Sequence, residues 1–306
     1  MISGLYKGHT ALSKLLIFIA LLLIGFGLTT IIGFLLIQPL FGFDVIHHPE
    51  LFTDFSNPNN LGMMKFMQFL NSIGIFVFPP LVFAFLVSEN WKSYLNLDLI
   101  PPLIIGIAAA LIMVFSQPWV NLMVVLNESL SLPDFLNAIE EWMRGKEDAA
   151  AEITASFLKM ENGLDLAINI LIVGMIPALG EELLFRGLIQ NQIIKRSGNI
   201  HLGIWISAFL FSAIHLQFYG FFPRMMLGGL FGYMLVWTGS LWVPILAHFV
   251  NNAGAVIIQY FIGGEMAEEQ LDTLGTTSDD WMYLLITGVF LTYLIHFIWK
   301  TRKIKA

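Results

Sequence analysis

The sequence predicts an all-α, polytopic membrane protein, a bundle of about eight transmembrane helices. Two observations carry this prediction. Of the 306 residues 57% are hydrophobic and only 12% are charged, whereas a soluble protein carries about 25% charged residues. The apolar residues also gather in repeated runs near the ~20 residues that a helix needs to cross a bilayer. These runs occupy most of the chain, so we expect a single integral-membrane domain over 1–306.

Eight apolar runs are long enough to be spans. The first follows Lys7 and Lys14, but it exceeds the roughly 7–15 apolar residues of a signal peptide and lacks a small-residue cleavage site. We therefore expect it to be retained. The fifth and sixth runs are short and are joined as a hairpin by the aromatic segment 217–223. The predicted spans are 15–37, 66–88, 102–126, 164–185, 202–217, 222–237, 241–261 and 281–299.

The distribution of charges indicates the orientation. Basic residues precede the first span and follow the last, so the positive-inside rule places both ends in the cytoplasm. That requires an even number of spans, and eight satisfies it. The pair Lys195-Arg196 falls in the loop after the fourth span, on the same side, and the small loops suit a bacterial inner membrane. An acidic loop falls outside, with Glu265, Glu268, Glu269, Asp272, Asp279 and Asp280.

Segment 127–163 is the longest break between spans. Its apolar residues follow helical spacing among charged ones, which predicts one or two amphipathic helices on the outer surface. We interpret the segment as helix packed on the bundle rather than as a partner-binding arm. The residues that set the spacing are Leu132, Phe135, Leu136, Ile139 and Met143.

Charge and cysteine content exclude several functions. The net charge of −7 lies mostly in acidic loops, which argues against nucleic acid as a partner. The chain has no cysteine. It can therefore form no disulfide and has no thiolate that could act as a nucleophile. A metal site would have to use His, Asp, Glu or Asn.

Ionisable residues are concentrated in the fourth, fifth and seventh spans. The first, second, third and eighth spans contain no Asp, Glu, Lys or Arg. A charge in hydrocarbon costs at least a few kcal/mol, so such residues usually mark a functional site or a proton path. We expect the catalytic core at about 164–260, with Glu181, Glu182, Arg186, His215, His248 and Asn252.

The two glutamates have different neighbours on a helix. Glu182 and Arg186 are four residues apart and can form a fixed, charge-neutral pair on one face. Glu181 lies about 100° around the helix, without that partner, and stays available for proton transfer. Pro177 cannot donate to the carbonyl of Val173, so a kink is expected just before the glutamates.

Two further pairs share a helix face. Phe211 lies one turn before His215, where its ring would exclude lipid or orient the imidazole. His248 and Asn252 are also one turn apart. An imidazole and a carboxamide at this spacing can both donate to one developing negative oxygen, as an oxyanion hole does.

Each pair also has a purely structural interpretation. A single transmembrane histidine more often joins helices than catalyses, and the pairing of Glu182 with Arg186, or the amides of Asn251 and Asn252, would suit helix packing alone. The concentration of all these residues in three spans favours a site. Arg224 is placed at a membrane interface without a role. The remaining histidines are placed at termini, loops or interfaces: His9, His47, His48, His201 and His296.

Three motifs together resemble a known family. Glu-Glu-x-x-x-Arg at 181–186, Phe-x-x-x-His at 211–215 and His-x-x-x-Asn at 248–252 look like the ordered motifs of CAAX-protease and bacteriocin-processing (CPBP) intramembrane proteases. That family includes the endopeptidases that trim prenylated CAAX proteins, and its fold is an eight-helix bundle. The resemblance covers roughly 164–260, about a third of the chain.

The resemblance implies a CAAX-type intramembrane endopeptidase. Glu181 with His215 would activate the attacking water, and His248 with Asn252 would stabilise the oxyanion. Membrane lipid and a hydrophobic or lipidated peptide substrate are the partners it implies. Supporting roles fall to Glu182, Arg186 and Phe211.

A metal remains an alternative at this stage. Glu181, His215 and His248 would be a workable zinc set with one position left for water. However, the sequence has no His-Glu-x-x-His motif, and a ligating Glu181 would leave the site without a general base. We therefore favour metal-free water activation, with no cofactor required and zinc as the alternative.

Two other functions also stay open. A non-catalytic membrane adaptor or immunity-type protein would use the polar set structurally. A proton-coupled transporter would use it as a relay, although the chain shows no inverted repeat of the kind found in many carriers.

Overall fold

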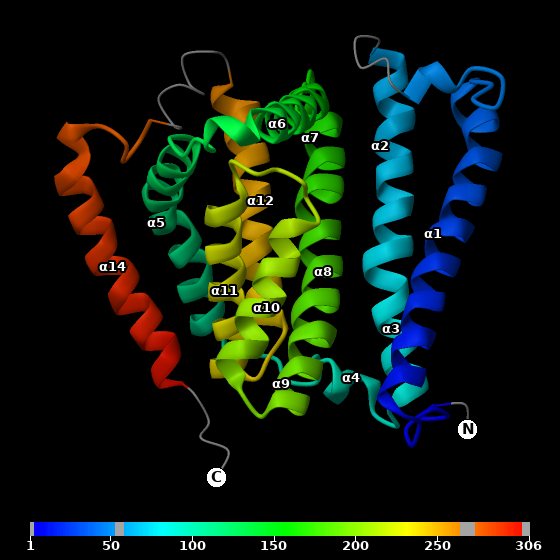
Figure 1. Ribbon diagram of the computed structural model, residues 1–306, viewed down its shortest axis with the longest axis horizontal. Helices are drawn as coiled ribbons and strands as arrows, with labels where there is room; N and C mark the ends of the chain where they lie inside the picture. Colours follow the sequence, from blue (N-terminus) through cyan, green and yellow to red (C-terminus); the bar gives the residue numbers. More distant parts are fainter. Residues whose placement is uncertain (1–2, 53–57, 264–272, 302–306) are drawn as a thin grey trace.

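The computed structural model describes residues 3–52, 58–263 and 273–301. Over these ranges the chain forms helices and no strands, which confirms the all-α class. The long helices lie side by side, and α1 begins at the same end of the bundle at which α14 ends (Figure 1). This arrangement agrees with an even number of crossings. Most of the predicted acidic loop, including Glu265 and Asp272, lies outside the described residues.

Six helices of the described chain are long and apolar enough to cross a membrane, as expected of an integral membrane protein. Two predicted spans, 202–217 and 222–237, correspond to the shorter apolar α10 (Ile200–Ala213) and to α11 (Phe221–Thr238). Neither is among the six, so the number eight stays a prediction. The six are α1 (Ala11–Phe41), α5 (Leu103–Glu128), α12 (Trp242–Ile262), α14 (Trp281–Lys300) and two composite helices, Asn60–Val87 and Gly163–Ser197.

Each composite helix contains a π-helical turn next to a proline. In the first, α2 (Pro58–Ser72) passes through Ile73–Val77 into α3 (Phe78–Val87), whose second residue is Pro79. In the second, α7 (Gly163–Asn169) passes through Ile170–Met175 into α8 (Ile176–Glu182), whose second residue is Pro177. Because proline has no N–H to donate, the preceding turn widens. The kink expected before the glutamates therefore takes the form of a π-helical turn.

The fourth span is longer than predicted. After α8 the helix continues through Leu183–Gln190, also π-helical, into α9 (Asn191–Ser197). It ends only at Gly198, which adopts a left-handed conformation with φ of 66° and caps the helix. Lys195 and Arg196 therefore lie in the last turn of α9, and their placement in a loop was wrong. Basic side chains are favourable there because they face the negative end of the helix dipole.

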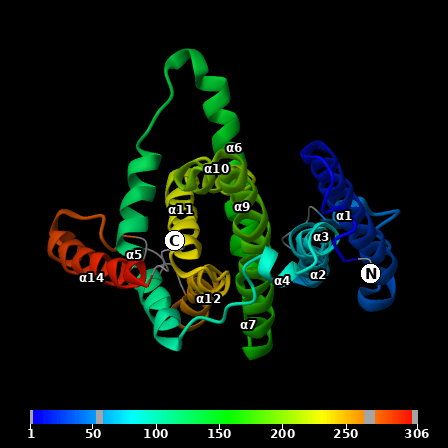
Figure 2. The same cartoon turned by 90° about the horizontal axis from the view of Figure 1, so that it is seen from below.

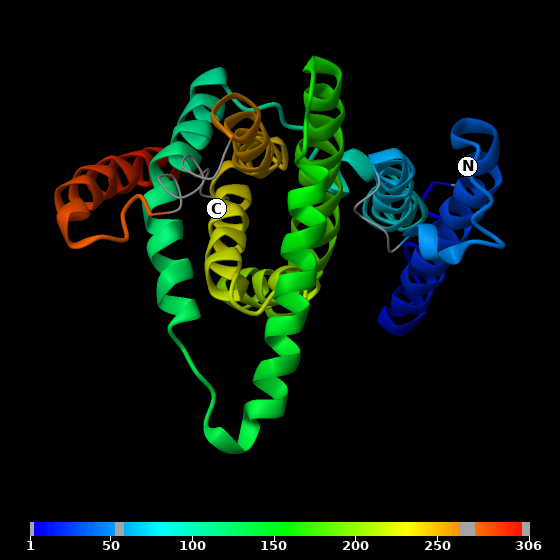
Figure 3. The same cartoon turned by 90° about the horizontal axis from the view of Figure 1, so that it is seen from above.

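The predicted amphipathic segment forms one helix, α6 (Asn137–Phe157), after a short 3-10 turn. It lies across the end of the bundle away from the start of α1 (Figures 1 and 3). Glu147 of α6 accepts a hydrogen bond from the backbone N–H of Tyr219 at 3.2 Å, and Trp142 packs on Phe218 with ring centroids 5.2 Å apart. Thus α6 is attached to the connection between α10 and α11.

The helices divide into a main bundle and a lateral hairpin. In the main bundle α5, α11, α12 and α14 enclose an apolar core around Ile112, Met113 and Met234. Figure 2 shows α1 at the edge of the molecule, next to α2 and α3. Most apolar side chains of α1 are exposed, and lipid rather than water is the solvent that such a surface requires.

Candidate active site

The predicted ion pair of Glu182 and Arg186 is present, at the junction of α8 and the π-helical segment Leu183–Gln190. Oε1 of Glu182 accepts a hydrogen bond from Nη1 of Arg186 at 2.7 Å, and both side chains are fully buried. The guanidinium also donates from Nη2 to the carbonyl of Gly228 at 3.0 Å, and it lies over the ring of Phe211 at 4.4 Å. Arg186 thereby ties the helix that carries the glutamates to α10 and α11.

His248 of α12 is held by the same carboxylate. Its Nδ1 lies 3.0 Å from Oε1 of Glu182, and its ring stacks on Phe231 with centroids 5.3 Å apart. A carboxylate paired with an arginine accepts hydrogen bonds, so Nδ1 of His248 carries the proton. The other ring nitrogen, Nε2, lies 3.8 Å from Oε2 of Glu181. Glu181 and Glu182 thus flank one imidazole.

His215 lies just past the end of α10. Its Nδ1 is 2.9 Å from the carbonyl oxygen of Phe211, one turn earlier. A carbonyl only accepts, so Nδ1 donates and the neutral ring presents the lone pair of Nε2. The contact that fixes the His215 ring is thus made by the backbone carbonyl of Phe211, whereas the sequence analysis assigned this role to the Phe211 ring. The ring of Phe211 also packs edge-on against both His215 and His248, at 5.4 and 5.8 Å.

Asn252 closes a chain of amide hydrogen bonds. Gln117 of α5 donates to Asn251 at 3.1 Å, Asn251 donates to Oδ1 of Asn252 at 3.1 Å, and Asn252 donates to the carbonyl of Val173 at 3.2 Å. Pro177 has no N–H, so it cannot donate to the carbonyl of Val173, four residues earlier. One N–H of the Asn252 amide thus bonds to a neighbouring helix. The other N–H has no hydrogen-bond partner among the described residues.

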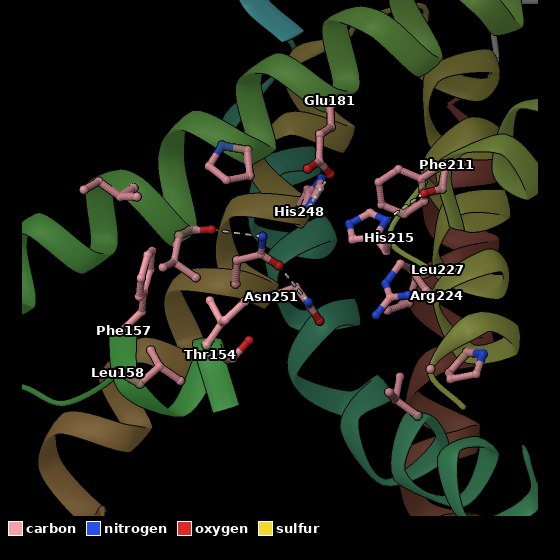
Figure 4. A pocket seen from close by; sticks show the side chains of 18 of the residues that line it. Thr154, Phe157, Leu158, Glu181, Phe211, His215, Arg224, Leu227, His248 and Asn251 are labelled. Carbon is pink, nitrogen blue, oxygen red and sulfur yellow. Dashed lines mark hydrogen bonds and ion pairs between the residues drawn. The ribbon is translucent and has the colours of Figure 1, made fainter. Parts of the chain in front are cut away.

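These side chains meet at one cavity of about 480 Å³. Figure 4 shows the carboxylate of Glu181 next to His248, with Phe211, His215 and Arg224 reaching in from the other side. Glu182 and Arg186 support the site from behind and do not line the cavity. Between Glu181 and His215 the described structure has no direct hydrogen bond. The lining includes Glu181, Phe211, His215, Arg224, His248, Asn251 and Asn252.

Arg224 was placed at a membrane interface from the sequence and given no role. It lies in the first turns of α11 and lines the cavity. An arginine inside a predicted apolar span was the signal, but its position three residues into the span suggested the interface. Only the turn of the chain at 214–220, which brings the start of α11 back over His215, places the guanidinium in the cavity.

The zinc alternative is not supported by the arrangement of donors. Within the described ranges no group of three or more His, Asp or Glu side chains is placed to hold a metal ion. Glu181, His215 and His248 line one cavity but do not converge as a ligand set. We therefore derive no step through a metal.

The fold and the site together define an α-helical membrane protein with a polar cavity lined by Glu, His, Arg and Asn side chains. Residues 163–254 match the family model described as "Type II CAAX prenyl endopeptidase Rce1-like". This segment contains all three motifs, and it is similar to the Rce1-like endopeptidases that the family model describes.

Two curated proteins of Bacillus subtilis (strain 168) are similar to parts of the chain. The "Uncharacterized protein YpbD" is 33% identical over 89 residues, which are 28% of this chain and 42% of that protein. The "Putative membrane peptidase YdiL" is 27% identical over 124 residues, 40% of this chain and 47% of that protein. Each match therefore spans less than half of the relative. No solved structure matches the chain.

Proposed function

We propose that the protein is a CAAX-type intramembrane endopeptidase, which hydrolyses a peptide bond in a membrane-associated or hydrophobic substrate. The observation that carries this proposal is that Glu181, His215, His248 and Asn252, from three separate helices, line one cavity of about 480 Å³. A cavity of this size is within the range of small-ligand sites and accommodates water with a short peptide segment. The family match over 163–254 supports the same chemistry.

In this proposal the water is activated by Glu181 and His215. The Nδ1 proton of His215 is engaged by the Phe211 carbonyl, so the Nε2 lone pair is the basic atom that faces the cavity. A water between this nitrogen and the Glu181 carboxylate can lose a proton to either group as its oxygen attacks the substrate carbonyl carbon. The proton then passes to the leaving amine as the C–N bond breaks.

The oxyanion is stabilised by His248 and Asn252 in the same proposal. His248 keeps its Nδ1 proton on Glu182, and a second proton on Nε2 makes that nitrogen a charged donor beside Glu181. Asn252 adds the N–H that its bond to Val173 leaves over. Fixed donors aimed at developing negative charge in a site of low dielectric stabilise the transition state more than donors in water do.

The proposed location is the bacterial inner membrane, with both ends of the chain in the cytoplasm. The ends of α1 and α14 on one side of the bundle, together with Lys7, Lys14 and Lys300 near those ends, support this orientation. Membrane lipid surrounds the bundle, and the substrate is a hydrophobic or lipidated peptide.

A peptidase assay with a matched control tests the proposal. Purified wild type and Glu181→Ala are compared on a panel of membrane peptides, and the exposed Glu161→Ala serves as control. We expect Glu181→Ala to lose about 100-fold or more of the activity, as removal of a general base does, and Glu161→Ala to retain it. Equal cleavage by wild type and Glu181→Ala would refute the proposal.

The same preparation tests the metal-free route. Dialysis against a chelator is expected to leave the cleavage rate of the wild type unchanged, and metal analysis to find no stoichiometric zinc. Zinc that is lost together with activity, and restores activity when added back, would contradict the metal-free route.

A further inference from the structure

Arg224 is a cation of the cavity whose charge is not paired. Its Nη2 donates to Oε1 of Gln217, a neutral amide, at 2.7 Å. Its Nη1 is buried and has no hydrogen-bond partner in the described part of the chain. No ion pair between described residues includes Arg224. A buried charged donor without a partner costs free energy, so a group from outside the chain is expected to meet it.

Two carboxylates act on Arg224 through their charge, but neither forms an ion pair with it. Glu147 and Glu181 are the acids whose charge reaches Arg224. Glu147 accepts the backbone N–H of Tyr219, and Glu181 faces Nε2 of His248. Arg186, the other arginine of this region, differs from Arg224 because it pairs with Glu182 in a fully buried contact. The unpaired positive charge of the cavity therefore belongs to Arg224.

The local backbone also favours an anion at this position. Arg224 lies in the first turn of α11, which begins at Phe221 after Gly220. A helix N-terminus carries partial positive charge, so it disfavours a cation and attracts an anion. Gly220 leaves room for the guanidinium, because a Cβ there would lie 3.0 Å from Nη2. Figure 4 shows the group beside His215, facing the cavity.

We propose that Arg224 binds a carboxylate of the peptide substrate next to the bond that is cleaved. A planar guanidinium pairs with a carboxylate through two parallel hydrogen bonds. Nη1 of Arg224, which has no partner among the described residues, can donate one of them. Two sources share this chemistry, the free C-terminus of the peptide and an Asp or Glu side chain. The amides of Asn251 and Asn252 in the same lining favour a peptide over the phosphate of a lipid headgroup.

This inference rests on the proposed function and names the substrate feature that the site selects. Its test measures binding rather than cleavage, so the two can fail separately. The Glu181→Gln variant in detergent is titrated with dye-labelled apolar peptides of identical sequence, and anisotropy is measured. One peptide ends in a free carboxylate, one in an amide, and one in an amide preceded by glutamate.

We expect at least one carboxylate peptide to bind about 10-fold more tightly than the neutral one, as a buried charge-assisted bond implies. Adding Arg224→Gln is expected to remove this preference, and Arg224→Lys to keep part of it. Arg196→Gln, which removes an exposed charge at the end of α9, is expected to keep all of it. Comparing the same peptides across variants cancels their different partition into micelles.

Four results would overturn the assignment of Arg224. The first is equal binding of all three peptides to Glu181→Gln. The second is a preference for the carboxylate peptides that remains after Arg224→Gln is added. Phosphatidylglycerol that binds in place of every peptide, and binds less to Arg224→Gln, would assign the guanidinium to lipid. Cleavage of neutral and anionic peptides at equal rates would reject the inference and leave the peptidase itself intact.

Discussion

Glu182 connects the structural and the chemical parts of the site. One of its oxygens accepts from both Arg186, at 2.7 Å, and His248, at 3.0 Å. The spacing of four residues on one helix predicted the first contact. The second joins residues 66 positions apart and depends on how α12 packs against α8. Glu181, its neighbour in sequence, faces the cavity instead.

This double contact leads to a prediction that separates stability from activity. Glu182→Gln leaves Arg186 buried without a counter-charge, which costs about 3–5 kcal/mol in comparable buried pairs. We expect a lower unfolding temperature in detergent and a loss of peptide cleavage. In Glu182→Gln with Arg186→Met, most of the stability should return because the unpaired charge is gone. Cleavage should not return, since His248 still lacks its carboxylate.

The exposed pair of Lys7 and Glu89 provides the control for this experiment. Glu89→Gln removes the same charge from the surface, where ion pairs contribute little, and is expected to change neither property. A double variant that regains full cleavage would show that the hydrogen bond from His248 to Glu182 has no part in the reaction.

At the scale of the helices, the site depends on how closely α11 approaches its neighbours. The backbone carbonyl of Gly228 on α11 accepts a hydrogen bond from Arg186. A Cβ at this glycine would lie 2.9 Å from Nη2 of Arg186 and 3.1 Å from the ring of Phe211. Helix 163–197, α10 and α11 therefore meet around one guanidinium, and the glycine is what allows the contact.

Gly228→Ala is therefore expected to destabilise the protein and lower its activity together. The added methyl group must displace the guanidinium or the Phe211 ring, and overpacking of this kind costs about 1–3 kcal/mol. Thermal unfolding and peptide cleavage measure the two effects. Gly254→Ala is the matched control, because among the described residues nothing beyond its chain neighbours and the backbone of its own helix lies within 4 Å of a Cβ at that position. There alanine should be neutral or stabilising, by up to about 1 kcal/mol. If the two variants had the same stability and the same activity, the close approach of α11 to Arg186 would not be required for either property.

At the scale of the whole molecule, the proposed reacting groups and much of the cavity wall come from different parts of the chain. The Rce1-like match covers 163–254 and supplies Glu181, His215, His248 and Asn252. Much of the remaining wall comes from segments outside this match, on α2, α5 and α6. Those lining residues are Gln68, Val120, Val124, Ile153, Thr154, Phe157 and Leu158. Part of the substrate preference is therefore expected to depend on these earlier helices, whereas the proposed chemistry and the proposed carboxylate recognition by Arg224 depend on the later ones.

The proposed orientation of the whole molecule can be tested with single cysteines, because the natural chain has none. Glu128→Cys lies at the end of α5, near the outer helix α6, and Thr301→Cys follows α14; both positions are exposed. In intact cells a membrane-impermeant maleimide should label Glu128→Cys, and Thr301→Cys only after permeabilisation. Labelling with the opposite pattern would invert the orientation, and labelling of both from outside would contradict it.

Local sequence determined much of this protein. Apolar runs predict where helices lie, because backbone hydrogen bonds in lipid must be satisfied within each segment. Spacings of four residues predict the contacts of Glu182 with Arg186 and of Phe211 with His215, because both lie on one helix turn. The acidic and histidine motifs also indicated the segment that the family comparison matches.

Tertiary structure alone decided what these residues face. The contact of His248 with Glu182, the bond of Asn252 to the carbonyl left over by Pro177 and the position of Arg224 in the cavity all join distant segments. No periodicity encodes them, since they follow from how closely whole helices pack. The continuation of the fourth helix to Ser197 was missed for a related reason: its polar last turns leave the apolar span but keep their helical hydrogen bonds up to the cap at Gly198.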